Sequence, residues 1–359
     1  MSARIRQTVR YVAASDGLRL AWAESGTGIP LVKAATWLTH LEYDLDSPVW
    51  SHWMTFLTNH FRFVRYDERG CGMSEWNVRD LSLNRRVLDL ETVVQAAHLS
   101  EPFVLLGISH GAAVCIAYAV QHPERVARMV LYGGFARGAL RRGDREAARL
   151  YEAIAVLADS WGSDNPVFRQ VFTSRFIPQG TEEQLRWFNE LCCKTTSPEL
   201  AGTLLRARAG TDISALLGQV RTPTLVVHAR NDAIAPLAEG RFLASEIPGA
   251  QFVEVDSPNH VLLEHEPAWT RFQDAVLDFT GRRRTAPGAG SDPAFAALSR
   301  RERETLALLS DGLSNADIAE RLGISEKTVR NHLSHLFDKL GVWSRAQAIV
   351  FARERGFVS

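Results

Sequence analysis

The sequence contains no long hydrophobic run. No apolar stretch approaches the roughly 18 residues that suggest a membrane-spanning helix. Residues 1–17, MSARIRQTVRYVAASDG, lack the apolar segment of a secretory signal peptide. We therefore expect a soluble, cytoplasmic protein that has no membrane partner.

Cysteine is scarce and follows no metal-binding pattern. The four cysteines are Cys71, Cys115, Cys192 and Cys193, without Cys-x-x-Cys or Cys/His ligand spacing. The adjacent pair at 192 and 193 does not indicate a disulfide framework. We expect reduced thiols, no metal site and no cofactor.

An excess of charge of either sign is also missing. Lys+Arg and Asp+Glu both number 41, so net charge indicates no nucleic-acid partner, and any basic surface must be local. Hydrophobic residues make up 46% and charged residues 23%, which excludes a disordered or fibrous chain. Because 359 residues exceed what one hydrophobic core usually serves, we expect at least two domains.

Short strand-like runs alternate with helical periodicity from Gln7 to about Thr280, which predicts a mostly parallel sheet covered on both faces. The turn at residues 15–17 predicts that the first two strands are antiparallel. After the sixth run, residues 135–221 have only helical patterns and are expected to form a lid. Residues 281–293, rich in Gly, Pro, Ala and Arg, predict a linker between domains over 1–280 and 294–359. The eight runs are TVRYVA, LRLAWAE, PLVKAA, FRFVRYD, FVLLGIS, VARMVLYGG, TLVVHA and QFVEVD.

A strand, a sharp turn and a helix surround Ser109. The run from Phe103 leads into Gly-Ile-Ser-His-Gly at 107–111, and residues 112–121 have the pattern of an apolar helix. The glycines allow a turn that exposes the Ser109 hydroxyl, and the helix N-terminus supplies N–H donors. The pattern predicts a nucleophile at Ser109; the alternative is a glycine-bracketed serine without chemistry.

An acid and a base follow in the chain. Asp232 comes after TLVVHA, and His260 comes after QFVEVD. The histidine would take the serine proton, and the aspartate would orient the imidazole and stabilise its cation. Asp212 competes as the acid, but its place before ISALLGQV favours a helix N-cap. His228 and His265 are expected to be structural.

Together with DERGCGMS at residues 67–74, these motifs resemble the α/β-hydrolase superfamily over roughly the first 280 residues. The resemblance implies that fold, with a helical lid and an oxyanion hole that uses the His110 backbone N–H. The superfamily commonly carries His-Gly after the third strand, whereas this chain has KAATW at residues 33–37. Thr36 or Trp37 is therefore the expected second donor. Some members of the superfamily have an aspartate nucleophile at this turn, and the serine here excludes their chemistry. The reactions that remain open are hydrolysis of an ester, a lactone, a thioester or a carbon–carbon bond.

From Leu298 the sequence predicts four short helices in a small all-α domain. The capping signals at their starts are Ser299 with Glu302, Ser314 with Asp317, Ser325, and Ser344 with Gln347. In the third helix an apolar stripe should face the core, formed by Val329, Leu333, Leu336, Phe337 and Leu340.

The opposite face of that helix has the residue types that contact DNA. Cation, amide and hydroxyl side chains recur there at i, i+3, i+4 and i+7, suited to base edges and phosphates; a merely solvated face is the alternative. The predicted contacts are Lys327, Thr328, Arg330, Asn331, His332 and Ser334. The sequence SNADIAERLGISEKTVRNHL resembles the LuxR-type (GerE-like) helix-turn-helix, a likeness that covers residues 296–357. The resemblance implies a homodimer on a near-palindromic operator, paired through a last helix at 345–355.

Three functions remain open. The first is a transcriptional regulator whose hydrolase-like domain binds a small-molecule ligand. The second is an active serine esterase or lactonase with an appended DNA-binding domain. The first two functions are compatible if the substrate of the enzyme is also the signal that the regulator senses. A protein-interaction role for the C-terminal domain is the third. No N-terminal segment resembles a phosphoacceptor domain. We therefore expect the regulator to be controlled by binding of a ligand and not by phosphorylation.

Overall fold

The computed structural model describes residues 5–162, 166–282, 295, 298–310 and 312–354. The chain divides into two compact units, Met1–Thr280 and Gly281–Ser359. Each unit has hydrophobic clusters of its own. Of the predicted linker, only Gly281 and Arg282 lie inside the described residues.

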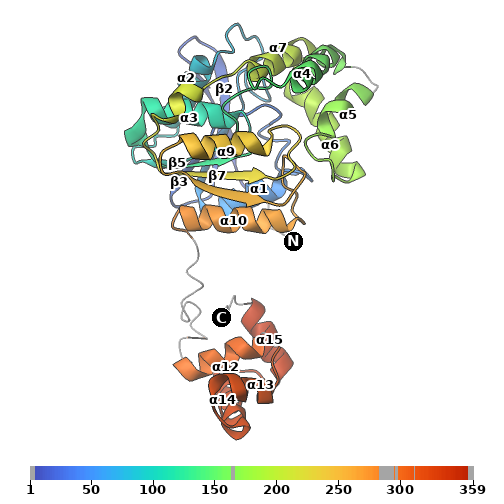
Figure 1. The fold of residues 1–359 in the computed structure, drawn as a ribbon. Helices are drawn as coiled ribbons and strands as arrows, with labels where there is room; N and C mark the ends of the chain where they lie inside the picture. Colours follow the sequence, from blue (N-terminus) through green and yellow to red (C-terminus); the bar gives the residue numbers. More distant parts are fainter. Residues whose placement is uncertain (1–4, 163–165, 283–294, 296–297, 311, 355–359) are drawn as a thin grey trace. The chain divides into compact units, whose positions relative to one another are not determined.

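An eight-stranded sheet forms the centre of the first unit, in the order β1-β2-β4-β3-β5-β6-β7-β8 (Figure 1). β2 pairs antiparallel with both β1 and β4, and every other neighbouring pair is parallel. The mostly parallel sheet and its antiparallel start are confirmed. The strands are β1 (Thr8–Ala13), β2 (Arg19–Ser25), β3 (Pro30–Lys33), β4 (Arg62–Tyr66), β5 (Phe103–Ile108), β6 (Val126–Tyr132), β7 (Thr224–Ala229) and β8 (Gln251–Val255).

Helices cover both faces of the sheet (Figure 1). α2 (Leu83–Ala96), α3 (Gly111–Gln121) and α9 (Leu237–Glu246) pack on one face, and α1 (Ser51–His60) and α10 (Pro267–Phe279) pack on the other. Because both faces are covered, every residue of β5 and β7 is buried. This explains why these two strands are continuous apolar runs in the sequence.

The lid segment between β6 and β7 is helical. Its helices are α4 (Arg145–Leu157), η2 (Ala158–Ser160), α5 (Val167–Thr173), α6 (Glu182–Thr195), α7 (Pro198–Ala209) and α8 (Ser214–Leu217), and the short helix η1 (Pro123–Arg125) precedes β6. Local signals start two of them: Thr181 and Gln184 form a capping box for α6, and Ser197 caps α7 ahead of Pro198. Among the described residues, no helix is both long and apolar enough to cross a membrane.

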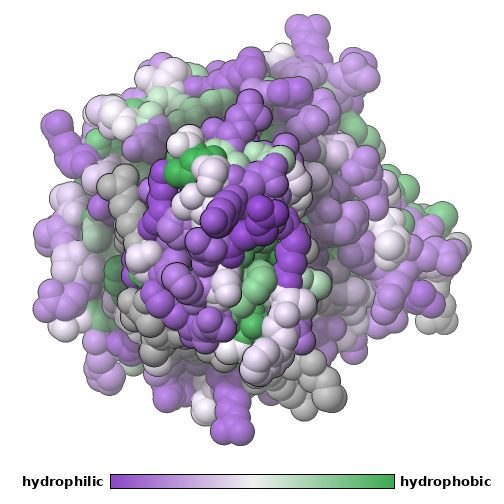
Figure 2. Space-filling model, turned by 90° about the horizontal axis from the view of Figure 1, so that it is seen from below, coloured by the Kyte–Doolittle hydropathy of each residue, from purple (hydrophilic) through white to green (hydrophobic). Residues whose placement is uncertain are grey.

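The helices of the second unit with described bounds are α12 (Arg300–Ser310), α13 (Asn315–Leu322), α14 (Glu326–Leu340) and α15 (Arg345–Glu354) (Figure 1). All four predicted capping serines accept a backbone N–H three residues ahead, which confirms those helix starts. Gly323 and Gly341 end α13 and α14 in the left-handed conformation, with φ of 62° and 68°. The predicted apolar stripe of α14 packs in the core. The surface seen in Figure 2 is mainly hydrophilic, with hydrophobic residues in small separate areas.

Candidate active site and nucleic-acid interface

Ser109 occupies a strained turn between β5 and α3. Its φ is 54°, in the left-handed region that residues other than glycine rarely adopt. A Cβ on Gly107 would lie 2.7 Å from the Cα of Ala112 and 2.8 Å from the Sγ of Cys115, so only glycine lets α3 pack this closely. Ser109 is half-buried, whereas its neighbours Ile108 and His110 are buried. The turn therefore leaves Ser109 more accessible to solvent than the residues on either side.

Asp232 and His260 meet after β7 and β8. The imidazole Nδ1 of His260 donates to Oδ2 of Asp232 across 2.6 Å. The other carboxylate oxygen of Asp232 accepts the backbone N–H groups of Ile234 and Ala235, at 2.8 and 2.9 Å. Both residues, like Ser109, follow the carboxyl ends of parallel strands, which meet at one edge of the sheet.

The electrostatics of the pair suit a base and its orienting acid. Burial acts to raise the pKa of Asp232, but the His260 and His228 rings and the Ala235 N–H outweigh it and hold that pKa below its ordinary value. The carboxylate is therefore ionised at neutral pH. Because Nδ1 of His260 donates to it, Nε2 is the nitrogen that can accept a proton. Nε2 is buried and has no hydrogen-bond partner among the described residues.

The competing residues have structural surroundings. His228 is buried and its Nε2 donates to the carbonyl of Ala235 across 2.7 Å, so it supports the loop that holds Asp232. Burial lowers the pKa of His228. Asp212 accepts from the backbone N–H and the hydroxyl of Ser214; it lies one residue before the N-cap of α8, which is Ile213. His265 is exposed.

The backbone N–H groups predicted to form an oxyanion hole lie at the start of α3 and in the loop after β3. His110 is the N-cap of α3, and Thr36 and Trp37 are buried in the loop after β3. None of their backbone N–H groups forms a hydrogen bond within the described part of the chain. The next residue, Leu38, has a φ of 62°, so this loop is strained as the serine turn is. The arrangement leaves donors free for an oxygen that gains negative charge.

Behind His110 lies a buried charge cluster that sequence reasoning missed. Nε of Arg86 is 2.6 Å from Oε1 of Glu68, and Nη2 of Arg208 donates to the other oxygen of the same carboxylate. Nη1 of Arg86 is 3.5 Å from Nε2 of His110, which is also 3.0 Å from the hydroxyl of Thr211. Glu68 belongs to the DERGCGMS motif, but nothing in the sequence indicates its two arginine partners.

The segment from Arg175 to Gln179 joins the lid to both loops that carry the candidate pair. Arg175 donates to the Ala233 carbonyl across 2.5 Å, next to Asp232. The Phe176 carbonyl accepts the His260 backbone N–H across 2.8 Å. The Gln179 backbone N–H donates to the Asn259 side chain across 3.1 Å. These contacts also had no signal in the sequence.

On α14 the predicted DNA contacts divide into two groups. Lys327, Arg330, Asn331 and Ser334 are exposed. Thr328 and His332 are half-buried, and the Thr328 hydroxyl lies 2.8 Å from the capping hydroxyl of Ser325. His335 is exposed four residues after Asn331 and was missed, although the i+4 spacing could have indicated it.

A second exposed surface in this unit is apolar. Trp343, just before α15, is 89% exposed, and Val350 within α15 is 52% exposed. Trp343 precedes the helix, and the exposed residues Ala346, Gln347 and Val350 lie within it. A tryptophan left in water is an unusual feature of an isolated small domain.

Known proteins resemble the two units separately. Residues 52–267 match the family described as "Serine aminopeptidase, S33", and residues 296–352 match "Bacterial regulatory proteins, luxR family". A solved hydrolase from Pseudomonas aeruginosa superposes with a TM-score of 0.63 at 26% identity, covering 76% of this chain and 98% of that one. The expected α/β-hydrolase fold and helix-turn-helix are confirmed.

Two curated relatives show the same division. The pimeloyl-[acyl-carrier protein] methyl ester esterase of Nitrosomonas europaea is 29% identical over 235 residues, which cover 64% of this chain and 87% of the esterase. The DNA-binding transcriptional activator DevR/DosR of Mycobacterium tuberculosis is 51% identical over 63 residues, covering 18% of this chain and 29% of the activator.

Proposed function

The chain belongs to the serine aminopeptidase S33 family of α/β-hydrolases and ends in a regulatory domain of the LuxR family, and on this basis we propose that it is a ligand-responsive transcriptional regulator. In this proposal the C-terminal unit binds operator DNA in the cytoplasm, and the hydrolase unit binds a small-molecule ligand beside Ser109 under a lid at residues 135–221. The observation that carries the proposal is the exposed Lys327-Arg330-Asn331-Ser334 face of α14.

That face supports DNA binding through its chemistry and its rigidity. Two cations and an amide project from one side of a helix whose other side is locked into the core through Val329, Leu333 and Leu336. Because the side chains are held on a rigid element, they can present one fixed pattern to a major groove. Pairing of two copies through Trp343 and Val350 would suit a near-palindromic operator.

Operator titration tests the regulator. The full-length Ser109→Ala protein first selects its sites from a random DNA pool, and its operator affinity is then measured with and without the p-nitrophenyl ester that the wild type cleaves best. We expect a change of about 5- to 150-fold, the usual range of coupling between two sites. If the ester is shown to bind the protein but operator affinity does not change, the proposal of ligand sensing is wrong.

A second candidate function, serine esterase or lactonase, is favoured by two observations: the Asp232–His260 hydrogen bond of 2.6 Å and the strained turn at Ser109. The nucleophile, base and acid would be Ser109, His260 and Asp232, with the N–H groups of His110 and of Thr36 or Trp37 holding the oxyanion. The esterase name of the Nitrosomonas europaea relative supports the same reaction class.

Ester turnover tests the enzyme. Wild type is expected to hydrolyse short p-nitrophenyl esters, and Ser109→Ala is expected to lose about 1,000-fold or more of that rate. Ser245→Ala, at an exposed serine of α9, is the matched control and should keep the wild-type rate. Equal rates in wild type and Ser109→Ala would exclude Ser109 as the nucleophile.

A further inference from the structure

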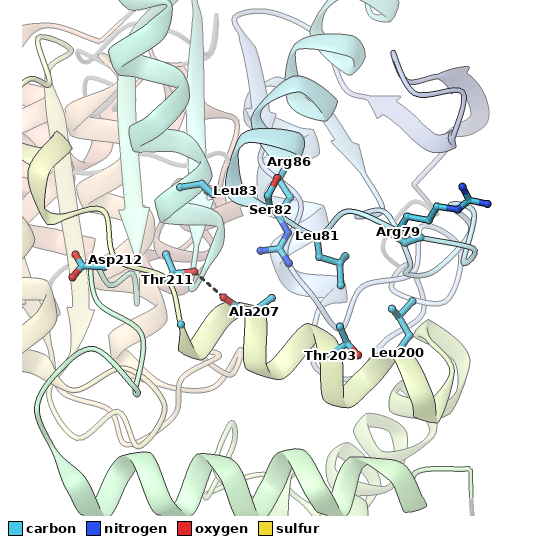
Figure 3. A pocket seen from close by; sticks show the side chains of 12 residues that line it. Arg79, Leu81, Ser82, Leu83, Arg86, Leu200, Thr203, Ala207, Thr211 and Asp212 are labelled. Atoms are coloured by element: carbon cyan, nitrogen blue, oxygen red, sulfur yellow. Dashed lines mark hydrogen bonds between the residues drawn. The ribbon is translucent and has the colours of Figure 1, made fainter.

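A cavity of about 580 Å³ opens between the start of α2 and the lid helix α7 (Figure 3). Aliphatic side chains line part of it: Val78, Leu81, Leu83 and Leu200. Polar side chains line the rest: Arg79, Ser82, Arg86, Thr203, Thr211 and Asp212. The volume lies within the range of small-molecule sites, and the mixed lining suits a ligand with one polar end and one apolar end.

Arg86 is a buried cation in the wall of this cavity. Its side chain is 4% exposed, yet its Nη2 has no hydrogen-bond partner among the described residues. Figure 3 shows its guanidinium directed from α2 into the space in front of α7. A buried donor left unpaired is costly, so such groups normally meet a ligand or water.

Two arginines beside the cavity have one carboxylate partner between them, and the neighbouring Arg69 pairs with two carboxylates of its own, Asp16 and Asp89. The two arginines are Arg86 and Arg208, and the carboxylate that they share is that of Glu68. His110 beside them is neutral, because burial and the two arginines hold its pKa well below the ordinary value. The Asp212 carboxylate is held by Ser214 and lies beyond Thr211 in Figure 3. Within the group of Arg86, Arg208 and Glu68, one positive charge therefore remains in a poorly solvated place, where an anion is stabilised.

The start of α2 adds to this preference. The helix has 14 residues, and its N-cap Ser82 and first residue Leu83 both line the cavity. Free backbone N–H groups in a first helical turn, together with the helix dipole, favour an anionic group. The neighbouring side chains of Leu81 and Leu200 are apolar, so an alkyl chain fits beside the charged end.

We propose that this cavity binds a small aliphatic carboxylate, with its carboxylate on Arg86 and its alkyl chain against Leu81, Leu83 and Leu200. The site is separate from the function proposed for Ser109 and does not depend on hydrolysis. Arg86 also contacts His110, the residue after Ser109. A carboxylate bound to Arg86 would therefore change the contacts of His110, whose backbone N–H belongs to the candidate oxyanion hole.

Isothermal titration of the full-length protein with hexanoate tests the proposal, with hexanamide as the uncharged analogue. We expect saturable 1:1 binding of hexanoate and at least tenfold weaker binding of hexanamide. Arg86→Gln should weaken hexanoate binding at least tenfold, while Arg208 still pairs with Glu68. Thr203→Trp, at an exposed position of α7 that lines the cavity, should abolish binding by filling the space.

Two control variants distinguish binding in this cavity from binding elsewhere on the protein. Arg206→Gln removes an α7 arginine outside the cavity lining and should change affinity less than twofold. Ser109→Ala should bind hexanoate like wild type, whatever its effect on ester turnover. The proposal fails if hexanoate does not saturate below about 10 mM. It also fails if folded Thr203→Trp binds hexanoate like wild type, or if hexanamide binds equally well.

Discussion

The backbone carbonyl of Phe176 in the lid accepts a hydrogen bond of 2.8 Å from the backbone N–H of His260. The same carbonyl accepts the Val261 N–H at 3.2 Å, and the Phe176 ring meets the His260 imidazole edge-on, with 5.3 Å between centroids. One lid residue therefore restrains both the backbone and the ring of the candidate base. Lid displacement and histidine placement are coupled at this point.

Phe176→Ala removes the ring contact and leaves the backbone carbonyl in place. We expect kcat for p-nitrophenyl esters to fall about 2- to 10-fold, since an aromatic edge contact is worth about 0.5–1.5 kcal/mol, with KM nearly unchanged. Trp187→Ala is the control, because this residue of the same lid stacks on Tyr43, outside the lid, with 4.9 Å between ring centroids. Equal losses in the two variants would show that general lid packing, not His260 placement, is responsible.

Arg330→Ala should weaken operator binding by about 1–3 kcal/mol and relax specificity at one base pair, because an exposed arginine on α14 can read a base edge. Binding to wild-type and singly substituted operators, measured over a salt series, checks this. Arg321→Ala, an exposed arginine on α13, is the matched control. A uniform loss on all sequences with a smaller salt slope would instead identify Arg330 as a phosphate contact.

Trp343→Ala should weaken dimerisation of the full-length protein by about 30-fold or more, the loss of roughly 2 kcal/mol that a tryptophan hot spot provides. Sedimentation velocity over a concentration series measures the dimer constant. Tyr11→Ala removes another exposed aromatic, 55% exposed on β1, and should leave association unchanged. Identical dimer constants for wild type and Trp343→Ala would remove this surface from the interface.

Acid should loosen the C-terminal unit through Glu302. Burial acts to raise the pKa of Glu302, but Lys339 at 2.7 Å and the Ser299 backbone N–H outweigh it and lower the pKa to about 2, from 4.5. A carboxyl with a depressed folded-state pKa contributes stability that is present above pH 4.5 and lost as the pH falls toward 2. Protection of α12 and α14 peptides against hydrogen exchange, measured relative to the intrinsic exchange rate at each pH, should therefore fall as the pH is lowered across that window.

Glu302→Gln tests the assignment. The variant should exchange faster than wild type at neutral pH, and its exchange should depend less on pH between 4.5 and 2 after correction for the intrinsic rate. Glu320→Gln, at an exposed position of α13, should retain the wild-type dependence. An unchanged pH profile in Glu302→Gln would assign the acid sensitivity to another group.

Local patterns were enough to predict the strands of the first unit and the four capped helices of the second. Alternation between apolar runs and helical stretches predicted the eight strands, because a covered parallel strand needs an unbroken apolar run. Each of the four C-terminal helices begins at a serine that accepts the backbone N–H three residues ahead, so nearby residues determine where these helices start. The serines are Ser299, Ser314, Ser325 and Ser344. The place of Ser109 on a strained turn was likewise predictable from Gly107 and Gly111.

Only the tertiary structure decided which distant side chains share a buried space. Glu68 and Arg208 are 140 positions apart, and nothing near either residue indicates the other. Phe176 reaches His260 only because the lid folds back over the carboxyl edge of the sheet. The periodicity of apolar residues in the sequence predicts which face of a helix or strand is buried, because that face is formed by residues close together in the chain. The choice of partner for a buried charge depends on how whole elements pack, which no local pattern encodes.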